Sequence, residues 1–102
     1  MESWRTVFRE GLAPILPLAG LEYAAEMLRN DDRRLMQSVI TNPPGLMCVA
    51  DWPCEGGCFI SMCGFGSGLK TVGEVGEFFA QMCFDADQLL GEPAACWWFL
   101  NW

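Results

Sequence analysis

The stretch TVGEVGEFFAQMCFDADQLLG, residues 71–91, predicts a helix more clearly than any other part of the chain. Thr71 and Glu74 have the spacing of a capping box, in which the hydroxyl and the carboxylate each accept a first-turn backbone N–H. Gly91 is typical of a helix stop. Apolar residues recur at helical spacing between these signals, at Val75, Phe78, Phe79, Met82, Cys83, Ala86, Leu89 and Leu90. We expect this helix to form the core together with helices from the first forty residues and the aromatic C-terminus.

Two shorter helices are predicted near the ends of the chain. Ser3 is a suitable N-cap for the first of them. This helix should stop or kink near Leu12, because Pro14 lacks an N–H and clashes with the preceding turn. The last helix is expected over residues 93–102, with Pro93 in its first turn.

A second and a third helix are predicted between the first helix and residue 41. One follows Gly20 and the other covers residues 35–40, capped by the polar residues 30–32. Residues 41–45 read TNPPG and end the third helix. Because the connection is short, we expect these two helices to form an antiparallel hairpin.

The middle of the chain carries the weakest signals. Asp51 and Pro53 suit a helix start and favour a helix through residues 54–63. The alternative is a short buried strand over residues 58–63. Residues 64–68 read GFGSG and predict a flexible loop.

Length and charge limit the class of protein. A chain of 102 residues is expected to form one domain, here an all-α domain of five to six short helices over residues 1–102. The net charge of −7 argues against binding to nucleic acid or to an anionic membrane surface. No stretch is apolar for the roughly 18 residues of a membrane span, and the N-terminus lacks a clear signal peptide. We therefore expect a cytoplasmic protein.

Six cysteines and no histidine are present, and the cysteines allow three interpretations. They can be small core residues, since free cysteine is among the most buried residue types. Cys48, Cys54, Cys58 and Cys63 can instead hold a zinc ion, because four thiolates close a tetrahedral site. Disulfide pairs are the third interpretation. The cysteine spacings match helix periods and contain no C-x2-C pair, so we favour the core and expect no metal or cofactor.

Catalytic signals are sparse. A cysteine nucleophile needs a nearby base, usually histidine, or a strongly lowered pKa. Cys54, expected in a first helical turn, is the best placed thiol, and a thiol redox protein is the second alternative after zinc binding. The sequence favours a non-enzymatic protein-interaction or structural module and argues against a small-molecule substrate.

The C-terminal segment AACWWFLNW, residues 94–102, has a single polar residue, Asn101. A surface helix needs a polar face, so this segment belongs to the core or contacts a partner. Tryptophan is enriched among interface hot spots, which makes Trp97, Trp98 and Trp102 candidate anchors for a protein partner or for self-association. The alternative is that at least two of the three belong to the core.

Overall fold

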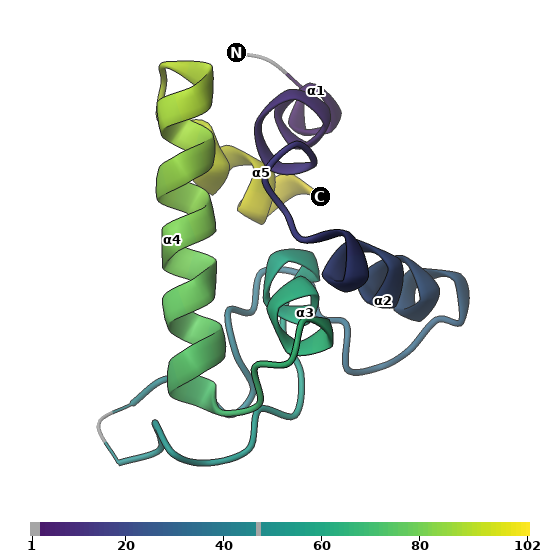
Figure 1. Cartoon of the computed structure of the whole chain (residues 1–102), viewed down its shortest axis with the longest axis vertical. Helices are drawn as coiled ribbons and strands as arrows, with labels where there is room; N and C mark the ends of the chain where they lie inside the picture. Colours follow the sequence, from purple (N-terminus) through teal and green to yellow (C-terminus); the bar gives the residue numbers. More distant parts are fainter. Residues whose placement is uncertain (1–2, 47) are drawn as a thin grey trace.

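Helix α4, Val72–Leu90, forms one side of the molecule in the computed structural model (Figure 1). Its capping box is present as predicted: Thr71 Oγ1 accepts the N–H of Glu74 at 3.2 Å, and the Glu74 carboxylate accepts the N–H of Thr71 at 3.1 Å. Gly91 ends the helix in the left-handed conformation, with φ of 74°. The local signals of residues 71–91 therefore specify both ends of this helix.

The structure describes residues 3–46 and 48–102, and this part of the chain contains helices and no strand. The all-α single domain predicted from the sequence is confirmed. The remaining elements are α1 (Trp4–Val7), the π-helical turn η1 (Phe8–Leu12), α2 (Leu18–Arg29), α3 (Phe59–Gly66) and α5 (Ala95–Asn101). In the same described ranges, no helix is both long enough and apolar enough to cross a membrane.

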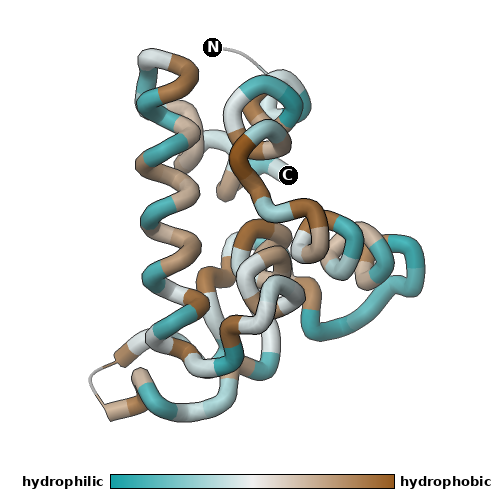
Figure 2. Tube along the Cα trace, viewed as in Figure 1, coloured by the Kyte–Doolittle hydropathy of each residue, from teal (hydrophilic) through white to brown (hydrophobic). Residues whose placement is uncertain are grey.

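Helix α3 is the central element of the core. It packs against α2 on one side and against α4 on the other (Figure 1). Ile60 and Cys63 are completely buried, and the buried Ser61 hydroxyl is paired with the Cys58 thiol at 3.4 Å. Figure 2 shows that hydrophilic and apolar residues alternate along α4 and that a hydrophilic turn follows α2.

The first helix behaves as the sequence predicts. Ser3 caps α1 by accepting the N–H of Thr6. The helix then continues as the π-helical turn η1, in which the Ala13 N–H donates a hydrogen bond to the Phe8 carbonyl at 2.8 Å. It ends before Pro14. Helix α2 starts at Leu18, two residues before the predicted boundary at Gly20.

The predicted third helix over residues 35–40, and with it the helical hairpin, is wrong. The backbone of this segment pairs with a distant segment instead: Met36 N–H bonds to the Gly57 carbonyl at 2.8 Å, and Cys58 N–H bonds to the Val39 carbonyl at 2.7 Å. Ser38 has φ of 60°, which interrupts any helix there. The apolar residues of this segment have helical spacing, but its backbone N–H and C=O groups form hydrogen bonds with residues 57 and 58 instead of with one another.

The middle of the chain also differs from the prediction. The helix expected over residues 54–63 begins only at Phe59, as α3: residues 54–58 lie outside any helix, and Cys58 is the N-cap in an extended conformation. The first three residues of the expected loop 64–68 belong to α3. Glycine fits there because the ring of Phe78 lies against Gly64, where an added Cβ would meet it at 2.6 Å.

Helix α5 begins at Ala95 rather than at Pro93. Asp87 of α4 explains this start, because its Oδ1 accepts the N–H groups of Ala94 at 3.0 Å and of Ala95 at 2.8 Å. The carboxylate of one helix thus caps the next.

Candidate functional site

An open pocket lies between α1, η1, α2, the start of α3 and α5. Its volume is about 490 Å³. The walls are mainly aromatic, and we call it the aromatic pocket; its rings are those of Trp4, Phe8, Phe59, Trp98 and Trp102. Leu28 of α2 lies at its edge with 59% of its surface exposed, and Arg5 of α1 is also exposed there. A cavity of this size and lining suits apolar groups.

Four of the rings form a closed circuit of contacts. Trp98 and Trp102 stack with centroids 5.6 Å apart and planes 7° apart. Phe8 stacks on Trp98 at 6.2 Å and meets Phe59 edge to face at 5.4 Å, and Phe59 meets Trp102 at 6.3 Å. Each aromatic pair adds about 0.5–1.5 kcal/mol beyond the area it buries. The pocket wall is therefore held from three separate elements.

Among the described residues that line the aromatic pocket, Arg5 carries the one ionisable side chain. Its guanidinium carbon lies 4.4 Å from the centroid of the Trp4 ring, a cation–π contact. Within residues 3–46 and 48–102, Arg5 forms no salt bridge. The described lining of the pocket thus combines aromatic surface with the positive charge of Arg5.

The structure brings two of the three predicted tryptophan anchors together. Trp98 is 1% exposed and belongs to the core, and the half-buried Trp102 lines the aromatic pocket beside it. Trp97 is 39% exposed and lies outside the pocket. Positions 98 and 102 share one helix face because they are four residues apart, whereas adjacent residues face different directions.

Sequence reasoning missed the pocket residues outside the C-terminal segment. Trp4 and Phe8 belong to the first predicted helix, but nothing local in the sequence connects them to Phe59 or Trp102. The Trp102 indole N–H also has an unusual environment, because it is buried without an acceptor in the described structure. An unpaired buried donor costs about 1–3 kcal/mol, so Trp102 is the least well satisfied ring of the wall.

The cysteines of the alternative zinc site lie in different environments. Cys48 is exposed in a loop, whereas Cys54, Cys58 and Cys63 are buried. Among the residues that the structure describes, no three cysteine, aspartate, glutamate or histidine side chains are placed to hold a metal ion. Cys54 donates to the Gly56 carbonyl at 3.3 Å, so a protein group satisfies its thiol.

All six cysteines lie in the described part of the chain, and all six are unpaired. Burial raises the pKa of the Cys58 thiol and raises that of Cys63 to about 12. Burial, together with the nearby Cys58, Asp87 and Cys96, raises the pKa of Cys83 to about 12. Such thiols stay protonated near neutral pH and are poor nucleophiles.

We expect thiol reactivity to divide the cysteines by exposure. In the folded protein, Cys48 and Cys96 should react with a chromogenic disulfide reagent at pH 8 within minutes, because both are exposed. Cys58 and Cys63 should react at least about a hundredfold more slowly, since burial keeps them protonated and covered. All six should react in denaturant. Rapid reaction of four or more thiols in the folded state would contradict the buried positions.

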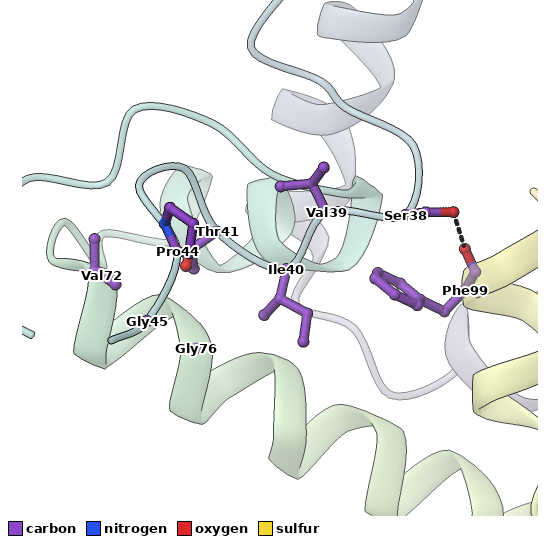
Figure 3. A pocket seen from close by; sticks show the side chains of 9 residues that line it. All are labelled: Ser38, Val39, Ile40, Thr41, Pro44, Gly45, Val72, Gly76 and Phe99. Atoms are coloured by element: carbon purple, nitrogen blue, oxygen red, sulfur yellow. Dashed lines mark hydrogen bonds between the residues drawn. The ribbon is translucent and has the colours of Figure 1, made fainter. Parts of the chain in front are cut away.

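A second cavity, of about 540 Å³, separates the loop of residues 38–45 from the first half of α4 (Figure 3). Ile40, Val72 and Phe99 contribute apolar side chains to it. The Ser38 hydroxyl donates to the Phe99 carbonyl at 3.4 Å and connects the loop to α5 (Figure 3). The described residues that line this cavity are apolar or uncharged.

Searches of protein-family models, curated proteins and solved structures with this chain found no match.

Proposed function

We propose that this chain is a non-enzymatic protein-interaction module whose aromatic pocket accepts an apolar side chain from a helical segment of a partner protein. The observation that carries the proposal is the open pocket walled by the four-ring circuit of Phe8, Phe59, Trp98 and Trp102. Amphipathic helices commonly bind by placing their apolar face into a hydrophobic groove of this kind. A rigid aromatic wall reduces the entropy lost on binding.

Arg5 supports a specific partner chemistry. Its guanidinium is held over Trp4 at the edge of the pocket, and charged groups around an apolar site fix the orientation of a bound segment. A glutamate one helical turn from the apolar anchor would match it. We therefore propose that the partner helix carries an acidic residue beside its apolar anchor.

A second copy of the chain is a weaker candidate for the occupant. Each molecule carries a net charge of −7, and like charges oppose association. We also propose a reducing compartment such as the cytoplasm, which the six unpaired thiols support.

The test uses fluorescently labelled, alanine-based helical peptides with leucine at positions i and i+4. One version carries a glutamate beside the leucines, and the other carries a lysine there. Fluorescence anisotropy in about 0.15 M salt limits the influence of distant charges, because the Debye length is then about 8 Å. We expect the glutamate peptide to bind about threefold or more tightly than the lysine peptide, although the protein is acidic overall.

Two exposed leucines of α2 provide a matched pair of variants. Leu28→Glu places a charge at the edge of the pocket and should weaken binding at least about tenfold, the effect of about 1.4 kcal/mol. Leu18→Glu introduces the same charge at a site that is 71% exposed and outside the pocket, and it should leave binding unchanged. Arg5→Gln should abolish the preference for glutamate. Equal effects of Leu28→Glu and Leu18→Glu, or no binding by either peptide, would count against the proposal.

A further inference from the structure

The C-terminal end of α4 forms a recess that the proposed function does not use. Its volume is about 540 Å³, and it lies where the chain leaves α4 toward α5 (Figure 1). Phe84, Asp87, Gln88 and Glu92 line it together with Gly91 and Pro93, and we call it the Phe84 recess. None of these residues lines the aromatic pocket.

Phe84 supplies an accessible aromatic ring to this recess. The side chain is 60% exposed, although α4 presents polar residues around it, including Gln81, whose amide donates to Asp85 at 2.8 Å. In the described structure, Phe84 takes part in no aromatic pair, in contrast to the rings of the aromatic pocket. A free aromatic face carries a negative quadrupole and attracts cations.

Two carboxylates face the same recess. Asp87 is held in place, because its Oδ1 accepts both the Ala94 and the Ala95 N–H, while its Oδ2 has no hydrogen-bond donor within residues 3–46 and 48–102. Glu92 is exposed and, in the same described ranges, forms neither a salt bridge nor a side-chain hydrogen bond. Both groups retain acceptor atoms for an incoming cation.

The chain does not neutralise this end of α4 itself. A helix C-terminus carries a partial negative charge that nearby lysine or arginine normally balances, yet the last turn of α4 contains no basic residue. Lys70 is the last basic residue of the sequence, and five acidic residues follow it. Glu92 also lines a neighbouring recess with Glu10 of η1, whose carboxylate pairs with Arg9 at 3.5 Å. The Phe84 recess itself therefore combines two carboxylates with a helix end that has no basic residue in its last turn.

We infer that the Phe84 recess binds an arginine side chain of a basic segment in a partner protein. A guanidinium is planar, so it can stack on the Phe84 ring while its N–H groups donate to the carboxylates of Asp87 and Glu92. An ammonium group matches the charge but lacks the stacking face. The other acceptors in the recess, including the Gln88 amide oxygen, suit the same ligand.

Isothermal titration calorimetry on the full chain can test this inference. The probe is the peptide acetyl-Gly-Arg-Gly-Arg-Gly-amide, and the matched peptides replace both arginines with citrulline, which is neutral and similar in shape, or with lysine. We expect citrulline to weaken binding at least about tenfold and lysine about threefold, consistent with charge-assisted and cation–π contacts. Arginine amide alone should bind at least about twofold more weakly than the peptide, because the peptide presents two arginines to the one recess.

Two variants locate the contact. Phe84→Leu keeps an apolar side chain but removes the ring, and Glu92→Gln removes one charge; each should weaken peptide binding about fivefold, the effect of about 1 kcal/mol. Glu77→Gln makes the same charge change at another exposed position of α4 and should have less than a twofold effect. Thermal unfolding would verify that all three variants fold. Leu28→Glu should not change the affinity for the arginine peptide. The two proposals, for the Phe84 recess and for the aromatic pocket, can therefore fail independently of each other.

Three results would overturn the inference. Equal loss in Glu77→Gln and Glu92→Gln would show that only the overall negative charge attracts the peptide. Equal affinity for the lysine peptide, or an unchanged affinity in Phe84→Leu, would exclude stacking on the ring. Equal affinity for arginine amide would show a site for the free amino acid rather than for a protein segment.

Discussion

Replacing Trp98 with alanine is expected to lower the free energy of unfolding by about 4 kcal/mol, since deleting a buried tryptophan typically costs about 3–5 kcal/mol. The side chain is 1% exposed and contacts both Phe8 and Trp102, so the change opens a cavity in the core and breaks the four-ring circuit. A domain of this size is stable by about 5–15 kcal/mol in all, so the variant should lose much of its stability. Urea unfolding followed by circular dichroism would measure the loss.

The neighbouring residue provides the control for this experiment. Trp97→Ala removes the same side chain from the adjacent position of α5, where 39% of it is exposed. We expect it to cost less than about 1 kcal/mol, as is usual for surface substitutions. Similar losses in the two variants would mean that Trp98 does not occupy the core position described here.

Gly20→Ala is expected to be the second strongly destabilising change, with a loss of about 3 kcal/mol, at the upper end for overpacked sites. Gly20 lies where α2 crosses α3, and an added Cβ would overlap the backbone carbonyl of Cys63 and come within 2.6 Å of Ser67 Oγ. The Ser67 hydroxyl is held there by its bond to that carbonyl at 2.7 Å. The methyl group therefore fits only if the two helices separate.

Gly76→Ala is the matched substitution with the opposite expected sign. Gly76 also lies inside a helix, but an added Cβ there would meet no atom of residues 3–46 and 48–102 within 4 Å. Alanine should therefore stabilise the protein by about 0.5–1 kcal/mol, because it restricts the unfolded chain and favours the helix. Comparing the urea midpoints of Gly20→Ala and Gly76→Ala tests whether α2 and α3 are in close contact at Gly20. A gain in stability from Gly20→Ala would show that α2 and α3 are not in close contact.

The two proposed surfaces differ in charge, and the sequence shows why. Five of the six basic residues precede residue 35, whereas seven of the thirteen acidic residues follow it. Arg5 at the aromatic pocket belongs to the first group, and the carboxylates of the Phe84 recess belong to the second. A partner that contacts both surfaces would need an acidic residue near its apolar anchor and a separate basic segment.

The ends of some helices follow from short-range sequence signals. Thr71, Glu74 and Gly91 predict both ends of α4, and Ser3 predicts the start of α1. These signals work because each cap joins residues no more than four positions apart, so the hydrogen bonds form wherever the rest of the chain lies. The C-terminal tryptophans were predicted to be in the core or at an interface by their size and by the lack of polar neighbours.

Only the tertiary structure decided the middle of the chain. Residues 35–40 have the apolar spacing of a helix, but their backbone groups find partners near Gly57, about twenty positions away in the sequence. Helix α3 contains glycines that lower its intrinsic propensity, and it forms because α2 and α4 cover it. The intrinsic preference of a residue for or against a helix amounts to about 1 kcal/mol or less. Packing and long-range hydrogen bonds therefore decide which of these segments becomes helical.

The candidate site shows the same division. The sequence predicted the three C-terminal tryptophans as anchors together, and only the structure separates the stacked Trp98 and Trp102 from the exposed Trp97. The sequence does not show that Phe8 and Phe59, about fifty positions apart, complete the wall around them, because that contact depends on how α3 meets η1 and α5. The sequence thus pointed to the tryptophans at one end of the chain, while the pocket exists only where distant segments pack together.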